Sequence, residues 1–165
     1  MPDSELEGSL RPPLKLDKTF QPCPVADGEE VYRNGIFLFN ISRILAHLDA
    51  HANEFPVKLV ALTDIQNYGD VNLDEDTIRS ADLSCPVLFA EIAPGRYNLI
   101  DGNHRVAKAR RVGAPTVAAR SIGCPHHVAF LTTFLGYGKY VEYWNSKLEE
   151  LSPAKAPRKP RKRVA

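Results

Sequence analysis

The chain has 165 residues, of which 44% are hydrophobic and 25% are charged, and its formal net charge is +1. These values are typical of one soluble globular domain with tails. No apolar run reaches the length of a membrane span, and the acidic N-terminus does not resemble a signal peptide. Three widely spaced cysteines fit reduced thiols better than a disulfide framework, so we expect a cytoplasmic protein without a membrane partner.

Residues 1–30 contain five of the thirteen prolines and show little apolar periodicity. This composition predicts an extended or disordered arm. The pattern of strands and helices that follows occupies residues 31–151, which we expect to form the folded domain.

The first half of this domain contains two predicted strands and two predicted helices. "GIFLFNI" (35–41) and "PVKLVAL" (56–62) are apolar runs of strand length. Between them, "SRILAHLDAHA" (42–52) has apolar residues at helical spacing, with Ser42 available as the N-cap. A shorter helix is predicted over residues 74–83.

The second half begins with a predicted β-hairpin, in which "PVLFAEI" (86–92) and "RYNLI" (96–100) flank the turn "APG". A helix follows, and then a strand over "PTVAARSI" (115–122). Residues 126–151 have a mostly helical pattern, with a break expected near "GYG" (136–138). This mixture of strands and helices predicts an α+β fold.

"LIDGNHRVAKARRVG" joins the predicted hairpin to a helix that we expect to end near residue 112. The first amide groups of a helix have no partner within it, and the helix dipole adds partial positive charge there. Gly102 permits a tight turn and close approach of a ligand, Arg105 offers a forked donor, and His104 can move a proton near neutral pH. Together with Asn103 they form a candidate anion site, and phosphate is the natural anion.

Asp101 does not fit simple anion binding, because a bare carboxylate repels phosphate. Three roles are open to it: it holds Mg²⁺, it orients His104 or Arg105, or it caps the helix. A cap is the commonest use of Asp before a helix, but it does not call for His and Arg next to it. Glu91, at the end of a predicted strand, is the candidate for a second metal-binding carboxylate.

From about Leu59 to Ile122 the sequence resembles the ParB/sulfiredoxin fold, through the hairpin, "DGNHRVAKARRVG" and "APTVAARSI". In that family a hairpin ends in a Gly-x-[His/Arg]-Arg turn, and a helix and a strand follow in a small mixed sheet with packed helices. "LTDI" (62–65) and the helix over 74–83 resemble the segment that precedes the hairpin in ParB-type domains. The arm, residues 35–52 and the C-terminal third lie outside the resemblance.

The resemblance implies a phosphate-binding turn made by Gly102, Asn103, His104 and Arg105. Members of the family include nucleotide-dependent chromosome-partitioning clamps, sulfiredoxin, free-serine kinases and small plasmid-encoded ATPases or DNases. Sulfiredoxin has its reactive cysteine where this chain has Asn103, so sulfinic acid reduction is not expected. About forty residues follow Ile122, too few for both a helix-turn-helix and a dimerisation region, so we expect a stand-alone member.

Residues 152–165 contain six Lys or Arg and no acidic residue, which leaves residues 1–151 with a formal net charge of −5. A basic block of this kind predicts a disordered tail that binds nucleic acid or another polyanion. A tail that only improves solubility is an equal alternative. DNA is therefore a candidate partner through the tail.

Two functions from different classes follow. In the first, ATP or CTP binds with Mg²⁺, the phosphates lie on residues 102–105, and Asp101 with Glu91 holds the metal. The nucleotide or a DNA phosphodiester is then hydrolysed, with Asp101, His104 and Arg105 as the catalytic residues. In the second, a non-catalytic module binds nucleotide or a protein partner as a switch or inhibitor, and a small-molecule kinase is a further alternative. The combination of acid, imidazole and arginine favours the enzyme.

Four other groups have structural interpretations. His47 and His51 lie four residues apart but lack a third zinc ligand, and "CPHH" (124–127) lacks a second pair, so we expect His127 to face the core. "GYGKY" lacks the Gly-Lys-Ser/Thr ending of a P-loop. The helically spaced aromatic residues are expected to form a packing face: Tyr137, Tyr140, Tyr143 and Trp144.

Overall fold

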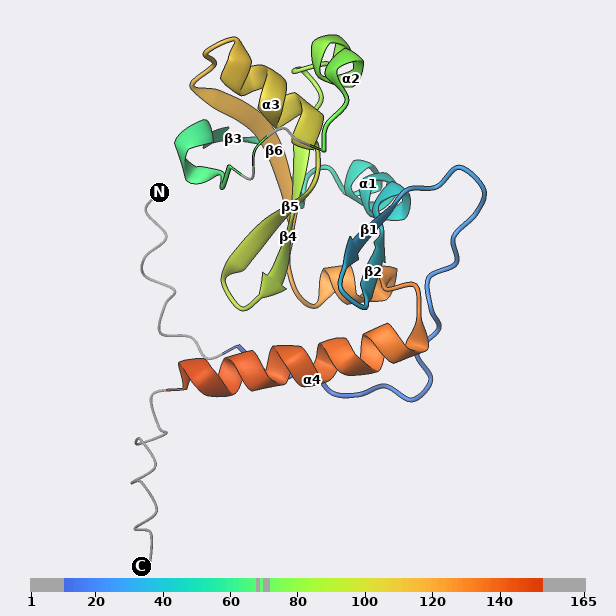
Figure 1. Cartoon of the computed structure of the whole chain (residues 1–165). Helices are drawn as coiled ribbons and strands as arrows, with labels where there is room; N and C mark the ends of the chain where they lie inside the picture. The colour runs from blue at the N-terminus through green and yellow to red at the C-terminus, as the bar shows by residue number, and fades with distance from the viewer. Residues whose placement is uncertain (1–10, 68, 70–71, 153–165) are drawn as a thin grey trace, which may run out of the picture.

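The computed structural model describes residues 11–67, 69 and 72–152 (Figure 1). It contains mixed strands and helices, so the expected α+β class is confirmed. None of the helices in these residues combines the length and apolar character needed to cross a bilayer. The elements in chain order are β1 (Val31–Asn34), β2 (Phe37–Asn40), α1 (Ile41–Ala50), β3 (Lys58–Ala61), the 3-10 helix η2 (Leu62–Asp64), α2 (Glu75–Ser80), β4 (Val87–Ala93), β5 (Arg96–Asp101), α3 (Asn103–Arg111), β6 (Thr116–Ile122), the 3-10 helix η3 (His126–Phe130) and α4 (Phe134–Leu151).

Four strands form the central sheet, in the spatial order β3-β6-β4-β5. The inner strands β4 and β6 run parallel, with Val87 opposite Ala119, and each edge strand pairs antiparallel with its inner neighbour. β1 and β2 form a separate antiparallel ribbon. The chain leaves the edge strand β5, forms α3, and returns to the interior of the sheet as β6 (Figure 1).

The central sheet has an apolar core on each face, because successive residues of a strand point to opposite faces. Val87 packs with Val106 and Val117 beneath α3. Its neighbour Leu88 belongs to the larger core on the other face, which includes Ile44 of α1 and Trp144 of α4. Helices therefore cover both faces, and α3 and α4 lie at separate ends of the molecule (Figure 1).

α1 begins at Ile41, and its N-cap is Asn40 rather than the predicted Ser42. The side-chain oxygen of Asn40 accepts the N–H of Arg43 at 3.1 Å, and its amide donates to the carbonyl of Pro24 at 3.0 Å. Ser42 lies inside the helix, where its hydroxyl accepts the N–H of Glu30 at 2.8 Å. The prediction was wrong because contacts with the preceding segment, which the sequence pattern does not reveal, select between two good capping residues.

α4 runs without interruption through residues 136–138, so the predicted break there is wrong. The interruption lies earlier, where Thr133 caps α4 by accepting the N–H of Gly136 at 2.9 Å. A Cβ at Gly136 would lie 2.7 Å from the Thr133 hydroxyl and 3.0 Å from the carbonyl oxygen of Ile36. Close packing, rather than a chain break, therefore accounts for this glycine.

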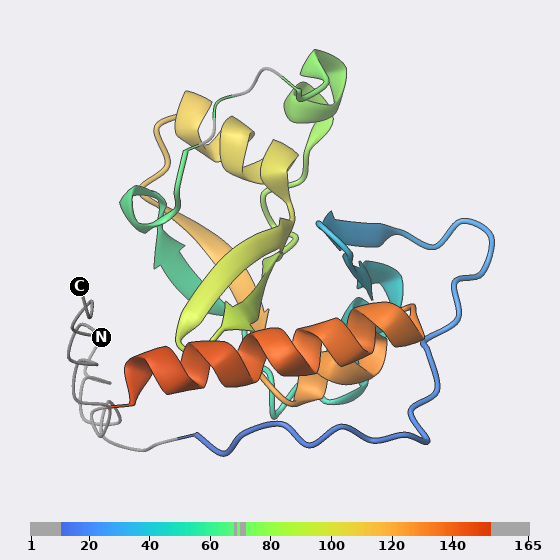
Figure 2. The ribbon, with the colours of Figure 1, turned by 60° about the horizontal axis from the view of Figure 1, so that its bottom comes forward.

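Residues 11–30, referred to as the arm, contain no helix or strand; the first part of the arm runs beside α4, and the later part leaves that helix to reach β1 (Figure 2). The side chain of Asn145 bonds both backbone groups of Leu14, at 2.8 and 2.9 Å. The ring of Phe20 stacks on Tyr137 with 3.9 Å between ring centroids. Residues 1–10 and the basic residues 153–165 lie outside the described part of the chain.

Candidate functional site

The predicted turn joins the end of β5 to the start of α3. Its central residue, Gly102, is the N-cap of α3 and has φ +109°, a backbone conformation that favours glycine. A Cβ at this position would lie 2.5 Å from Cγ1 of the buried Val87. Because Gly102 has no capping side chain, the first amide groups of α3 remain available to a ligand.

Arg105 connects the turn to the loop that precedes β4. Its Nη1 donates to the carbonyl oxygens of Pro86 at 2.6 Å and Cys85 at 3.1 Å, and its Nη2 donates to Oδ2 of Asp101 at 3.0 Å. The guanidinium is thus held by three acceptors within the protein, and 18% of the side chain is exposed. Arg105 therefore shapes the site and presents only part of its charge to solvent.

Asp101 orients Arg105, which is one of the three roles that the sequence left open. It does not cap α3, because the N-cap is Gly102 and no side chain makes the capping hydrogen bond. Only Oδ2 of the carboxylate is bonded to Arg105. The other oxygen, Oδ1, has no hydrogen-bond partner among the residues that the structure describes.

His104 faces α2, while Asn103 is exposed. Nε2 of His104 accepts the N–H of Asp74 at 3.3 Å, and Nδ1 lies on the other side of the ring. Asp74 is the N-cap of α2, and hydrogen bonds from Thr77 hold the pKa of its carboxyl below the usual range. His104 therefore has one nitrogen engaged in structure and one able to donate.

A pocket of about 520 Å³ opens beside the turn. Asp101, Gly102, His104 and Arg105 line it, whereas Asn103 does not. The fold adds residues that the sequence places far from the turn, including the exposed Cys85. These further lining residues are Leu45, Asp49, Thr77, Ala81, Asp82, Cys85, Pro86 and Arg120.

Arg120 of β6 supplies a second guanidinium to this pocket, and 13% of its side chain is exposed. Its Nη1 donates to Oδ1 of Asp49 at 2.7 Å. Its Nε is buried and has no hydrogen-bond partner within the described residues. Sequence reasoning missed Arg120 and Asp49, because an arginine in an ordinary strand pattern carries no signal that it faces a pocket.

Three carboxylates, from Asp49, Asp82 and Asp101, line the pocket beside the two arginines. Asp49 and Asp101 are ion-paired with those arginines. Asp82 accepts hydrogen bonds from the hydroxyl and the N–H of Ser84, which hold the pKa of Asp82 below its usual range. An anionic ligand would therefore depend on the unpartnered donors of the pocket rather than on a large excess of positive charge.

Glu91 is not brought to the turn. Strand register pairs Glu91 with Tyr97 and Leu88 with Asp101, so the two carboxylates lie at different ends of the hairpin. Glu91 is 1% exposed and is ion-paired with Arg11 of the arm. Across residues 11–67, 69 and 72–152, no three His, Cys, Asp or Glu side chains are grouped as metal ligands would be. The turn itself offers a metal one carboxylate, that of Asp101.

The other histidines pack against aromatic side chains. The rings of His47 and His51 lie 4.3 Å apart between centroids, and His47 also contacts Phe55 and Phe130. His127 is fully buried, as the sequence predicted, and burial lowers its pKa to about 4. The predicted aromatic face is also confirmed for three of its residues, since Tyr137, Tyr140 and Trp144 are buried.

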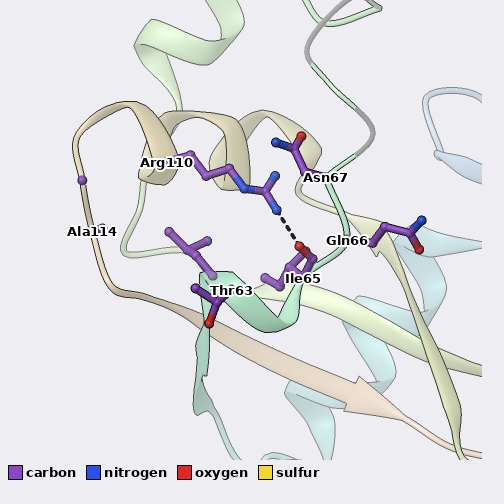
Figure 3. Close-up of a pocket in the computed structure, with 8 residues that line it drawn as sticks. Thr63, Ile65, Gln66, Asn67, Arg110 and Ala114 are labelled. Carbon is purple, nitrogen blue, oxygen red and sulfur yellow. Dashed lines mark hydrogen bonds between the residues drawn. The ribbon is translucent and has the colours of Figure 1, made fainter.

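A second pocket, of about 560 Å³, lies between η2 and the end of α3 (Figure 3). Arg110 is the one charged side chain that lines it among the described residues, and its Nη2 donates to the carbonyl of Ile65 at 2.7 Å. Thr63, Gln66 and Asn67 contribute neutral polar groups. This pocket has no acid or imidazole in its described lining, so the pocket beside Gly102 is the better candidate for chemistry.

Comparison of the chain with protein-family models, with curated proteins and with solved structures finds no match.

Proposed function

We propose that the protein binds the phosphate groups of a nucleoside triphosphate in the pocket beside Gly102. The observation that carries this proposal is that Arg120, with its unpartnered Nε, lines the same pocket as the uncapped N-terminus of α3. Helix N-terminal amides and guanidinium groups are both strong donors to phosphate oxygens. The bonds from Arg105 to Pro86 and Asp101 keep a second guanidinium fixed at the pocket wall.

Asp101 fits the role of a magnesium ligand through its unbonded oxygen, Oδ1. Mg²⁺ in nucleotide sites usually takes one or two carboxylates together with waters and the phosphates, so a single carboxylate is sufficient. When bound, the metal would neutralise phosphate charge beside the carboxylates of Asp49 and Asp82.

Hydrolysis of the nucleotide, or of a DNA phosphodiester, is a second candidate function. It is favoured by the presence of both His104 and Asp101 among the residues that line the pocket. With Nε2 held by Asp74, the Nδ1–H group of His104 can donate to a phosphoryl or leaving-group oxygen. Arg105 would stabilise the charge that develops on the phosphoryl oxygens. If the protein binds the nucleotide without hydrolysing it, the same site would serve a nucleotide-responsive binding module.

The finer fold assignment, a ParB/sulfiredoxin-like domain, is part of this proposal. It is supported by the succession of the β4–β5 hairpin, the glycine turn, α3 and β6 in one small mixed sheet. In that succession the N-terminus of α3 follows the hairpin directly, which is the position that the resemblance implies for a phosphate-binding turn.

Titration with labelled ATP, CTP and GTP, with and without Mg²⁺, tests the binding proposal. We expect Arg120→Ala to weaken binding about tenfold or more, since a charge-assisted hydrogen bond contributes roughly 1.5–3 kcal/mol. Arg96→Ala is the matched control, because Arg96 is an exposed arginine at the opposite end of β5. Equal affinity of the Arg120→Ala variant and the wild type would contradict the proposal.

Phosphate release and plasmid nicking test the hydrolytic function. We expect Asp101→Asn to retain most nucleotide binding but to lose turnover at saturating nucleotide and Mg²⁺, because positioning and charge stabilisation supply most of phosphoryl-transfer catalysis. A wild type that binds nucleotide but releases no phosphate and nicks no DNA would leave the binding module as the function.

A further inference from the structure

Glu91 carries a buried carboxylate at the end of the sheet remote from the turn. Its Oε1 accepts the N–H of Cys124 at 3.0 Å, and its Oε2 accepts the N–H of Gly95 at 2.9 Å. Only 1% of the residue is exposed. Both donors are backbone groups of the domain and not of the arm, so the carboxylate is held in place independently of Arg11.

Arg11 of the arm inserts its guanidinium above this carboxylate. Its Nη1 forms the ion pair with Oε2 of Glu91, and its Nη2 donates to the carbonyl oxygen of Cys124 at 3.3 Å. The guanidinium carbon lies 5.5 Å from the centroid of the Trp144 ring. A carboxylate, a carbonyl and an aromatic face are the three partners that suit a planar guanidinium, and a Lys ammonium matches this set less well.

We propose that Glu91, the Cys124 carbonyl and Trp144 form a guanidinium-binding site, which Arg11 fills in cis and which an arginine of another extended polypeptide segment can fill in trans. Arg11 itself indicates the kind of ligand that the site accepts. It is an arginine followed by Pro12 and Pro13 in a segment without regular secondary structure. This inference concerns the opposite end of the sheet and does not rest on the proposed nucleotide site.

The surroundings of the site favour an occupant that enters from solvent. Forty per cent of the Arg11 side chain is exposed, although the carboxylate beneath it is buried. Gly123 borders the site, and a Cβ there would lie 3.3 Å from Oε1 of Glu91 and 4.0 Å from Nη2 of Arg11. The absence of a side chain at residue 123 therefore leaves room for the Glu91 carboxylate beneath the guanidinium.

The Arg11 end of the arm is attached by contacts that an external ligand can replace. After Arg11, its next attachment is the pair of hydrogen bonds between the backbone of Leu14 and the side chain of Asn145. Because the Arg11 side chain is tethered to the domain, it competes with a free ligand as if it were present at a millimolar concentration. Removing the Arg11 side chain should therefore expose the site to free guanidinium compounds at millimolar concentration.

The test uses the full chain with Arg11→Ala and the fluorescence of Trp144, the single tryptophan of the protein. We expect a saturable fluorescence change with methylguanidinium at millimolar concentration and none with methylammonium at equal ionic strength. The wild type should need at least about ten times more methylguanidinium, because Arg11 competes for the site. A change of the same size with both cations, or none with either, would overturn the proposal.

Binding in trans is tested with a peptide of the arm sequence, SLRPPLKL, against the same peptide with Lys in place of its Arg. Both are titrated into the Arg11→Ala variant, and the arginine peptide should bind at least about tenfold more tightly. Adding Glu91→Gln should abolish that preference, and circular dichroism checks that the double variant is folded. If it does not fold, the comparison of the two peptides decides: equal affinities refute the site and a preference for arginine supports it.

Discussion

At Gly102, the backbone conformation and the packing both require a residue without a Cβ atom. Its φ of +109° is one that L side chains rarely adopt, and Val87, against which a Cβ would press, is completely buried. Gly113, by contrast, has φ +72° and open space around its missing Cβ. Alanine substitutions at these two glycines therefore distinguish the free-energy cost of backbone strain from the cost of a steric clash.

We expect Gly102→Ala to lower the free energy of unfolding by about 2–5 kcal/mol, because backbone strain and overpacking add. Gly113→Ala should cost only about 1–2 kcal/mol, since strain acts there alone. Urea denaturation of both variants measures the difference. Equal losses would show that Val87 moves aside without cost.

His127 is held neutral inside the larger core. Its Nε2 lies 2.5 Å from the carbonyl oxygen of Glu91 and 3.0 Å from the hydroxyl of Tyr140, and its buried Nδ1 has no hydrogen-bond partner in the part of the chain described. Protonation would place a charge at Nδ1 with no acceptor beside it. Burial therefore lowers the pKa of His127 to about 4, below its ordinary value of 6.5.

This lowered pKa predicts a pH dependence of stability. The unfolded chain binds a proton at His127 below about pH 6.5 and the folded chain only below about pH 4, so stability falls as the pH drops through this window. Below about pH 4, the free energy of unfolding should be about 3 kcal/mol lower than at pH 7. Denaturation of the wild type and His127→Gln at several pH values tests this, and we expect a flatter profile for the variant. Parallel profiles would assign the pH dependence to other groups.

At the scale of elements, the basic residues of α3 attach neighbouring segments to the helix. Lys108 donates to the carbonyl oxygens of Arg79 and Ala81, at 2.9 and 2.7 Å. Arg111 pairs with Glu75 of α2 at 2.7 Å. The basic pattern of this helix is therefore used largely for holding α2 and the loop before β4, and this loop forms one wall of the candidate site.

Arg105 joins α3 to both Asp101 and the loop before β4, which predicts a structural effect of its removal. We expect Arg105→Ala to lower the free energy of unfolding by about 1.5–3 kcal/mol through loss of charge-assisted hydrogen bonds to Pro86 and Asp101. Arg105→Lys should restore little of this, because an ammonium cannot bridge the same separated acceptors. Hydrogen exchange should rise in residues 81–86. The Arg96→Ala variant is the control. If hydrogen exchange in residues 81–86 of Arg105→Ala were the same as in that control, the structural role of Arg105 would be contradicted.

For the molecule as a whole, the charged and apolar parts of the chain are distributed unevenly. The two faces of the central sheet are covered by helices, and the arm adds a layer along α4 (Figure 2). The six basic residues of the C-terminal segment lie outside the described residues, while residues 1–151 carry a formal net charge of −5. Any attraction to DNA is therefore expected to depend on that segment.

Deletion of residues 152–165 tests this expectation. We predict weaker DNA association at low salt and a smaller slope of log affinity against log salt, by up to about 5, because six positive charges can release counterions. The melting temperature should stay nearly constant. Fluorescence anisotropy with a labelled duplex and thermal unfolding measure the two effects. A large fall in melting temperature would show that the segment packs on the domain.

The residue pattern was sufficient to predict the local structure around the candidate site. The hairpin, the glycine turn and the strand "PTVAARSI" were predicted close to their observed bounds, because residue periodicity and turn chemistry involve neighbours along the chain. The strand β1 was not predicted, since its exposed and half-buried residues show no apolar run. Turn residues and a strand-to-helix junction can thus be recognised without knowledge of the packing around them.

Which distant side chains meet depends on how the elements pack against one another. It selected Asn40 over Ser42 as a cap, turned Glu91 toward Arg11 and away from Asp101, and brought Arg120 beside Gly102. Each outcome depends on strand register and helix docking, which join positions far apart in the chain. A one-residue change of register would send every side chain of a strand to the other face, so no local pattern could have fixed these contacts.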